Sequence, residues 1–496
     1  MSPLKEHFTS RLGLIISVLG IAIGTGNIWR FPRIAAQNAG EGGAGAFLFV
    51  WVIFLLIWSI PLIIAEYAIG KSSRKGLTGA FVLQLGSKFG WMGSFIGCVA
   101  IAIMFYYSVV TGWCFYYIGY FIANPLPVEV SETKAIWDGF QSSIWPIVGH
   151  FFAIFGCAFV VSNGIKTIEK VNKVLIPMLL FILIGSAIRA FTLDGSENGL
   201  VFLFTPDWST LTSPKIWLEA LTQNAWDTGA GWGLILTYAI YMRESDRIKV
   251  SAFQTGFGNN AISMLSAMII FSSVFAILGQ SLSQSEVLAI MKDSGPASTG
   301  LTFIWLPKLF SYMAGGRFFG ILFFAGLSFA AFSSLISMVE MAARLGVDLG
   351  LSRVKAVWII ASIAFFAGIP SAINLNFLGN QDFVWGIALM ISGGFIAFAV
   401  IKQNASEFKK LAIETKESGD KLGKWWDVLI TYIIPLEAGL LLLWWMYRSA
   451  FEFSPDTWYN PFDPYSLAST VLQWVLLIGV LILFNSRISK RFLNKN

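Results

Sequence analysis

The residues best suited to chemistry lie in a glycine-rich stretch inside a long apolar segment. Residues 20–32 read Gly-Ile-Ala-Ile-Gly-Thr-Gly-Asn-Ile-Trp-Arg-Phe-Pro, so glycines, Asn27 and Arg30 interrupt a hydrophobic run. In a bilayer, irregular backbone survives only where it lines an enclosed cavity, because every N–H and C=O needs a partner. Carbonyls freed at such a break, and the ends of the half-helices, can bind ions and polar solutes. This stretch therefore predicts a binding site.

A second stretch, residues 227–233, has the same character and reads Asp-Thr-Gly-Ala-Gly-Trp-Gly. It lies five apolar segments after the first. Two interrupted helices at corresponding places in two halves are typical of inverted-repeat transporters, whose site lies between the breaks. Glycines also serve close helix packing, and the halves show no convincing residue-level repeat. The pairing of the two breaks is what favours a functional site.

Composition places these stretches in a membrane protein. Of the 496 residues, 56% are hydrophobic and 12% charged, whereas soluble proteins carry about 25% charged residues. A spanning helix needs about 20 apolar residues, and the first apolar segment is too long for a cleavable signal peptide. We therefore expect an all-α membrane protein with twelve transmembrane helices, near residues 12–36, 46–70, 91–122, 144–163, 172–191, 216–241, 252–279, 318–343, 354–371, 383–401, 427–447 and 466–486.

Loop charges predict the orientation. Basic residues gather in alternate loops, such as Lys71, Arg74 and Lys75 after the second segment, and the loops between them are acidic or neutral. The positive-inside rule then places both termini in the cytoplasm, with the chain in the plasma membrane. The net charge of +6 therefore indicates orientation and no nucleic-acid partner.

Residues typical of enzymes form no recognisable pattern. The cysteines, Cys98, Cys114 and Cys157, lie in apolar segments without metal-ligand spacing, which favours buried structural roles. The two histidines are far apart, and no nucleophile elbow, P-loop or zinc motif occurs. We expect no enzymatic activity.

A set of short motifs follows one another along the chain. They are Ser10-Arg11-Leu12-Gly13-Leu14, Gly24-Thr25-Gly26-Asn27-Ile28-Trp29-Arg30-Phe31-Pro32, Ile60-Pro61-Leu62 with Glu66, Tyr106-Tyr107 with Trp113, Gln223, Thr237-Tyr238 with Tyr241, Ser333-Ser334 and Asp382-Phe383. This ordered set resembles the neurotransmitter:sodium symporter family, whose bacterial members include the leucine transporter. The motifs keep the family order from about residue 5 to 385, so the resemblance covers the whole core.

The resemblance implies sodium-driven uptake of a small solute by alternating access. It implies a leucine-transporter-like core of two five-helix inverted repeats, with helices 1 and 6 broken, and it leaves a homodimer open. The expected organisation is an N-terminal segment 1–11, a transport core 12–401, a cytoplasmic loop 402–426, two peripheral helices 427–486 and a cytoplasmic tail 487–496.

By resemblance, the breaks hold two sodium ions. Sodium prefers oxygen ligands, and unwound carbonyls supply them without burying further charge. Ordinary hydrogen bonding across helices is the alternative for the serine pair. The residues implied for sodium 1 are Ala22, Asn27, Asp227 and Asn259, and those for sodium 2 are Gly20, Ile23, Ala330, Ser333 and Ser334.

Asp227 departs from the family pattern, which has Ser or Thr at this position. Chloride-dependent members bind the anion through a helix-2 Tyr, a Gln and a hydroxyl on helix 6 and a helix-7 Ser. The corresponding residues here are Trp51, Gln223, Asp227 and Ser263. Carboxylates within membranes are costly and usually functional. We therefore expect the Asp227 carboxylate to replace chloride.

The resemblance also implies a substrate pocket between the breaks. Gly24 replaces the Asp with which monoamine carriers meet the amine, so an amino acid is favoured over a monoamine. The amides near Thr25 would face an anionic group, and two tryptophans suggest a small or flat side chain, unless they only pack the core. The implied residues are Ile21, Ala22, Gly24, Thr25, Gly26, Ile103, Tyr107, Trp226, Gly229, Trp232, Ser334 and Met338.

Charged residues imply two gates. Arg30 and Asp382 would form the outer gate, and Lys5 with Asp348, near Tyr241, the inner one. Glu66 is expected to brace the broken helices, and Glu340 and Arg344, four residues apart on helix 8, are expected to pair. A sensor on this fold, a channel, and a carrier of an amine, a betaine-like solute or a divalent ion stay open as alternatives.

Overall fold

The computed structural model describes residues 6–293 and 300–493, and every regular element in these ranges is a helix. The elements up to the second break are α1 Arg11–Ala22, η1 Gly26–Arg30, α2 Phe31–Gln37, α3 Gly45–Phe54, η2 Leu55–Ser59, α4 Ile60–Ser73, α5 Leu77–Leu85, η3 Ser87–Phe89, α6 Gly90–Ala123, α7 Val130–Gln141, α8 Trp145–Ser162, α9 Ile165–Phe191, α10 Ser196–Phe204, η4 Trp208–Thr212 and α11 Pro214–Thr228.

The remaining elements begin after the second break. They are α12 Leu234–Ala239, α13 Ile248–Leu278, α14 Gln284–Lys292, η6 Leu301–Trp305, α15 Leu306–Ser311, α16 Gly316–Asp348, α17 Arg353–Ile373, α18 Leu375–Ile401, α19 Ala405–Ala412, α20 Lys424–Val428, η7 Leu429–Ile433, α21 Ile434–Arg448, η8 Ser449–Phe453 and α22 Leu467–Leu493.

In the described residues, ten helices are long and apolar enough to cross a bilayer, and α1 with η1–α2 gives an eleventh if the bent pair is one span. The expected sixth span, near 216–241, is divided between α11 and α12, which are too short to count separately. The all-helical class is therefore confirmed, while the count of twelve, the inverted repeat and the domain boundaries stay predictions.

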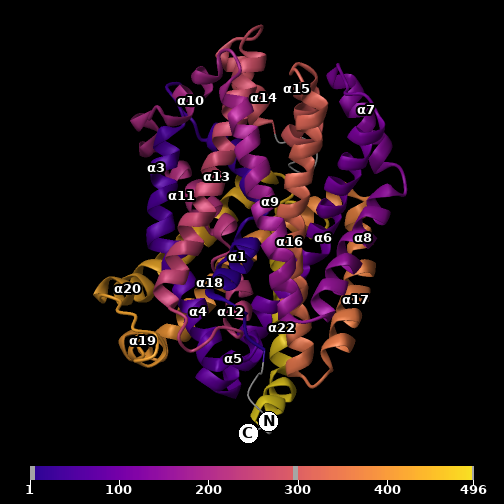
Figure 1. The fold of residues 1–496 in the computed structure, drawn as a ribbon. Helices are drawn as coiled ribbons and strands as arrows, with labels where there is room; N and C mark the ends of the chain where they lie inside the picture. Colours follow the sequence, from indigo (N-terminus) through magenta and orange to yellow (C-terminus); the bar gives the residue numbers. More distant parts are fainter. Residues whose placement is uncertain (1–5, 294–299, 494–496) are drawn as a thin grey trace.

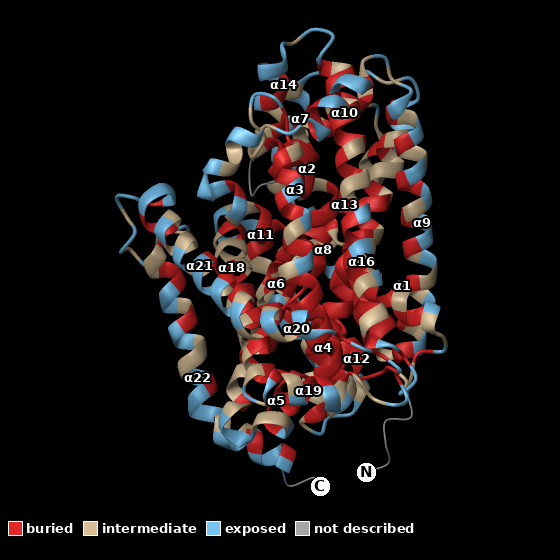
Figure 2. Ribbon diagram, turned by 90° about the vertical axis from the view of Figure 1, so that its left-hand side faces the viewer, coloured by how far each residue is buried: buried red, intermediate tan, exposed pale blue. Residues whose placement is uncertain are grey.

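The long helices run side by side, and the beginning of α1 and the end of α22 lie toward the same end of the molecule (Figure 1). Burial separates a core from a periphery. In the span Gly45–Ser73 72% of the most apolar window is buried, compared with 22% in Lys424–Phe453 and in Leu467–Leu493. Figure 2 shows buried residues gathered around α4 and α12, while α21 and α22 expose much of their surface. The last two spans are therefore peripheral.

The backbone departs from helical geometry in both glycine-rich stretches. After α1, Ile23 is extended, with φ −81° and ψ 93°, and the following helix is bent away by 56°. After α11, the three glycines at 229, 231 and 233 have positive φ values of 67°, 91° and 76°. This conformation favours glycine. Glu66 of α4 accepts hydrogen bonds from the N–H groups of Gly231 (2.7 Å) and Leu236 (3.1 Å), so it braces the second break as expected.

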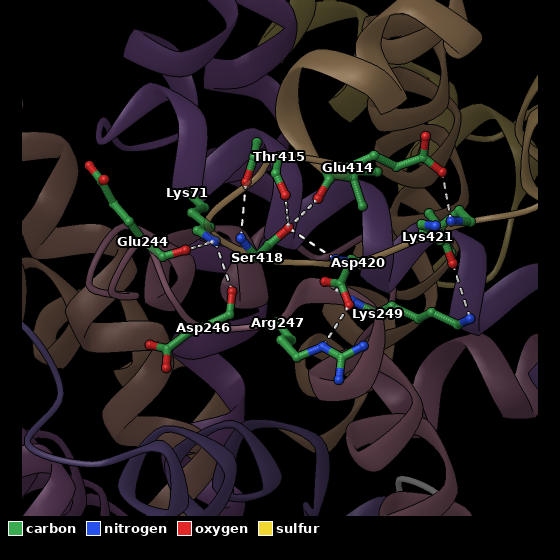
Figure 3. A network of polar contacts seen from close by, with 12 residues as sticks. Lys71, Glu244, Asp246, Arg247, Lys249, Glu414, Thr415, Ser418, Asp420 and Lys421 are labelled. Carbon is green, nitrogen blue, oxygen red and sulfur yellow. Dashed lines mark hydrogen bonds and ion pairs between the residues drawn. The ribbon is translucent and has the colours of Figure 1, made fainter.

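The loop between α18 and α20 anchors the beginning of α13 (Figure 3). The buried Asp420 accepts hydrogen bonds from the Arg247 side chain (3.2 Å) and the Lys249 N–H (3.1 Å). Lys71 of α4 donates to the carbonyls of Glu244 and Asp246, both at 2.8 Å. A carboxylate at a helix N-terminus stabilises the helix, and α13 carries the Asn259 and Ser263 side chains discussed next.

Candidate functional site

Asp227 lies in a buried polar cluster formed by three elements. Its Oδ1 accepts a hydrogen bond from Gln223 Nε2 (2.8 Å), one turn earlier on α11. Its Oδ2 accepts from the Ser263 hydroxyl of α13 (3.3 Å), and that hydroxyl accepts from Asn27 Nδ2 of η1 (2.8 Å). The Ser263 hydroxyl therefore links the Asp227 carboxylate to Asn27 in the first break.

Oxygen atoms converge beside this cluster. Asn259 Oδ1 lies 3.0 Å from the carbonyl oxygen of Ala22 and 3.1 Å from that of Asp227. Oxygens that face one another need a donor or a cation between them. Turning the Asn259 amide over would supply the donor, and a bound cation would make the turn unnecessary. Asn27 is 2.7 Å from the same amide, so the structure brings all four residues implied for sodium 1 together.

A second set of oxygens surrounds Ser334. Its hydroxyl lies 3.2, 3.1 and 3.3 Å from the carbonyl oxygens of Gly20, Ile21 and Ile23, at the end of α1. Ser333 instead donates to the carbonyl of Ala330 on its own helix, α16 (3.0 Å). One hydroxyl can donate to only one of three carbonyls, so the surplus of acceptors suits a cation. Of the residues implied for sodium 2, Gly20 and Ile23 therefore place their carbonyl oxygens next to the Ser334 hydroxyl.

A small cavity of about 30 Å³ lies between the two sets. Trp226 and Trp232 meet edge to face at 5.1 Å along its wall. A side chain at Gly24 would approach the Tyr107 hydroxyl to 3.0 Å, so glycine keeps the cavity open. The lining residues are Ile21, Ala22, Gly24, Gly26, Asn27, Tyr107, Trp226, Asp227, Gly229, Trp232, Leu234, Ser334 and Met338.

Two residues implied for the pocket do not line this cavity. The N–H of Thr25 donates to the Tyr107 hydroxyl (3.2 Å), and Ile103 is fully buried in the hydrophobic core. Conversely, Asn27 and Asp227, implied only for sodium, also line it, together with Leu234. Asp227 therefore faces both the oxygen cluster and the space for a solute.

A larger cavity of about 500 Å³ lies between α2, α11, the first half of α18 and the end of α21, and Trp226 lines both cavities. The side of the molecule that this larger cavity occupies is here called the outer side. The Arg30 guanidinium lies 4.8 Å from the centre of the Trp226 ring. Asp382 accepts a hydrogen bond from the Tyr106 hydroxyl (3.0 Å). Both residues implied for the outer gate line this cavity, but among the described residues they form no ion pair with each other.

Charged residues form two ion pairs on the opposite side of the molecule, here called the inner side. Tyr241 donates to Glu340 (2.5 Å), which also forms an ion pair with Arg353 at the start of α17. Arg344 pairs with Asp348 (3.0 Å), which accepts a further bond from the Gly76 N–H (2.6 Å). The expected Glu340–Arg344 pair is therefore wrong, because each residue has a different partner. Lys5 lies outside the described residues, so its contact with Asp348 stays a prediction.

Arg353 was not singled out from the sequence. It lies 13 positions beyond Glu340, and a single arginine at the beginning of a helix looks like any other residue of a basic loop. Only the folding of α17 against α16 brings the two side chains together.

Two glycine-rich stretches that depart from helical geometry beside oxygen acceptors, with a small cavity between them, are typical of secondary transporters of the membrane. The sequence matches the sodium:neurotransmitter symporter family over residues 5–143 and 137–495. The chain belongs to this family, which consists of sodium-coupled transporters and not of enzymes. The resemblance inferred from the motifs is thereby confirmed.

Relatives cover most of the chain. An uncharacterised sodium-dependent transporter of Methanocaldococcus jannaschii is 32% identical over 461 residues, which are 87% of this chain and 88% of that protein. The sodium-dependent neutral amino acid transporter B(0)AT2 of Rattus norvegicus is 30% identical over 307 residues, covering 55% of this chain and 41% of the relative. The crystal structure of MhsT in complex with L-phenylalanine superimposes with a TM-score of 0.77 at 28% identity, covering 88% of this chain and 99% of that chain.

Proposed function

We propose that this protein is a symporter that couples the inward movement of sodium to the uptake of a small amino acid. The observation that carries the proposal is the cavity between the breaks, flanked by the Asn259 and Ser334 oxygen sets. A solute in this cavity and cations at both sets would lie within a few ångströms of one another. Such proximity is what couples the binding of a substrate to that of ions.

Cavity size and wall chemistry support a small amino acid. A volume of about 30 Å³ has room for only a water or two. The indoles of Trp226 and Trp232 must therefore move to admit an amino acid, and a small one requires the least movement. Gly24 stands at the position where monoamine carriers have an aspartate that meets the amine, so this chain offers no acidic group there. The relatives agree in class, because B(0)AT2 is named as a neutral amino acid transporter and MhsT was crystallised with L-phenylalanine.

Asp227 supports transport that needs no chloride. Its carboxylate is held by Gln223 and Ser263, two positions that would otherwise face the anion. Trp51 has no hydroxyl to complete a chloride site, and its indole packs on Phe31 at 4.4 Å. A fixed carboxylate next to the sodium-1 residues then provides the negative charge that chloride gives elsewhere.

The two ends of the molecule support alternating access. The outer cavity extends to Trp226, while the Glu340–Arg353 and Arg344–Asp348 pairs on the inner side are suited to hold that side closed. Opening the inner side requires these pairs to separate, and closing the outer side would bring Arg30 toward Asp382. With the chain in the plasma membrane and both termini in the cytoplasm, this cycle carries solute and sodium inward.

A second candidate is the transport of an amine or a betaine-like solute. Asp227 lines the cavity together with two tryptophans, and a carboxylate beside aromatic faces is suited to an ammonium group. In this case the carboxylate would meet the solute rather than only the sodium ion.

Reconstituted protein separates these functions. We expect uptake of a small neutral amino acid into proteoliposomes to require a sodium gradient and to persist when gluconate replaces chloride. Loss of most uptake in gluconate would contradict chloride independence. A thermal-shift screen with and without sodium should show stabilisation by amino acids. Stabilisation by amines alone would establish the second candidate, and stabilisation without uptake would favour a sensor.

A further inference from the structure

Glu437 is an acidic residue of the peripheral helix α21 that neither sodium set nor the gates use. Its side chain is 7% exposed, and both carboxylate oxygens are buried without a hydrogen-bond partner among the described residues. The helix belongs to the apolar span Lys424–Phe453. Ionisable groups within a bilayer are rare and functional as a rule, and buried polar groups normally have partners. This carboxyl group therefore needs an explanation.

Glu437 lies close to the outer cavity. Leu441 follows Glu437 by four residues, so it lies one turn further along the same face of α21. Leu441 and Trp445 line the outer cavity of about 500 Å³. Glu437 therefore lies one turn beneath a wall of that cavity, on the face that α21 turns toward the protein core.

Close glycine contacts connect this region to the second break. A methyl group added at Gly231, in the break, would lie 2.9 Å from the Cα of Gly393 on α18. One added at the next residue of α18, Gly394, would lie 3.9 Å from the Cβ of Ala438, the neighbour of Glu437. The two adjacent glycines thus touch the break on one side and α21 on the other. Since α18 alone lies between these contacts, a shift of α21 would reach the second break through α18.

A second polar group without a hydrogen-bond partner in the described chain lies next to the glycines of α18. The indole of Trp58 in η2 packs 3.1 Å from the methyl position of Gly393, and its Nε1 has no partner among the described residues. The glycine pair therefore lies between an indole without a recorded partner and the helix that carries Glu437.

The occupant that fits Glu437 is a proton. Sodium needs several oxygen ligands, whereas no second side-chain oxygen is recorded at this carboxylate in the described part of the chain. No charged partner is recorded either. The titratable and charged groups on α21, on the elements packed against it and on the neighbouring α20 are Asp382 of α18, Lys215, Glu219 and Asp227 of α11, Lys424 and Asp427 of α20, Tyr432 of η7, Glu452 of η8, and Tyr447 and Arg448 of α21. None of them forms a recorded hydrogen bond or ion pair with Glu437.

We propose that Glu437 is a proton-binding site, reached from the outer cavity, whose protonation keeps α21 packed on α18 and so sets the pH dependence of transport. The neutral acid is compatible with a dry layer between helices, whereas an unpaired carboxylate draws in water and loosens the packing. Transport therefore falls as the outer pH rises. The inference rests on the proposed transport function for its effect, but not for the site itself.

The first test measures uptake against outer pH in proteoliposomes whose inner pH is clamped. Once the site is mostly ionised, wild-type uptake should fall by up to about tenfold per pH unit, because the protonated fraction of one site falls by that factor. Glu437→Gln, which mimics the neutral acid, should keep its uptake at alkaline pH, and Glu437→Asp should retain a pH dependence. The matched control, Asp456→Asn, removes an exposed carboxylate after the same helix and should behave as wild type.

The second test does not depend on transport. Difference infrared spectra between acidic and alkaline pH should contain a protonated-carboxyl band in the wild type that Glu437→Gln lacks and Asp456→Asn retains. An unchanged pH profile in Glu437→Gln, or an unchanged infrared band, would overturn the proposal. Absence of uptake by the wild type at every pH would instead refute the transport function and leave the infrared result to decide on the site.

Discussion

Replacing Asp227 by asparagine removes a fixed negative charge from the oxygen cluster while preserving side-chain size. The carboxylate reaches Asn27 through one hydroxyl, with successive distances of 3.3 and 2.8 Å, so a cation held by Asn27 and Asn259 would lie roughly 5 Å from it. With an effective dielectric constant of about 20, the attraction at that separation is about 3 kcal/mol. We therefore expect Asp227→Asn to weaken sodium binding by about 100-fold, since each 1.4 kcal/mol is tenfold.

The assay is a sodium titration of thermal stability and of uptake, each in chloride and in gluconate. Asp227→Ser alone should lose sodium affinity in both salts, because Trp51 cannot complete an anion site. The double variant Trp51→Tyr/Asp227→Ser should recover affinity in chloride but not in gluconate. A sodium titration of Asp227→Asn that superimposes on the wild type would refute the electrostatic argument. Ser263→Ala, which leaves the charge in place, serves as the control and should cost much less.

Three further predictions concern the braces, gates and walls. Glu66→Gln should lower the melting temperature, because hydrogen bonds to a charged acceptor contribute about 1.5–3 kcal/mol and Glu66 holds two N–H groups of the second break; an unchanged melting curve would contradict this role. Arg353→Ala removes the ion pair of Glu340 and leaves it, among the described residues, only the hydrogen bond from Tyr241, so labelling of a cysteine introduced at the inner side should become faster than in the control Arg189→Ala. Trp232→Phe enlarges the cavity and should admit longer aliphatic amino acids in competition uptake, whereas an identical substrate profile would show that this indole only packs the core.

Local patterns predicted those features that a short stretch of chain determines alone. Positive φ at Gly229 and the extended Ile23 follow from glycine runs in apolar segments, and an acidic residue beside one of them already suggested a binding site. Contacts between distant segments needed the fold. The spacing of four residues along one helix predicts an ion pair between Glu340 and Arg344. The pairing of Glu340 with Arg353 depends on the packing of two helices and could not be predicted from the sequence. Likewise, Ser333 and Ser334 are adjacent, and only the approach of α1 shows which hydroxyl reaches the break.

The buried carboxylate of Asp227 has an electrical consequence. With two sodium ions and a zwitterionic solute, the loaded site would carry one net positive charge, and the empty site one negative charge. An inside-negative membrane potential then favours both the inward step of the loaded carrier and the outward return of the empty one. Each elementary charge moved through the whole field is worth about 2.3 kcal/mol per 100 mV. In a carrier that binds chloride in place of the carboxylate, the empty site is uncharged. The return step of such a carrier would not depend on the membrane potential, whereas the return step of this protein would.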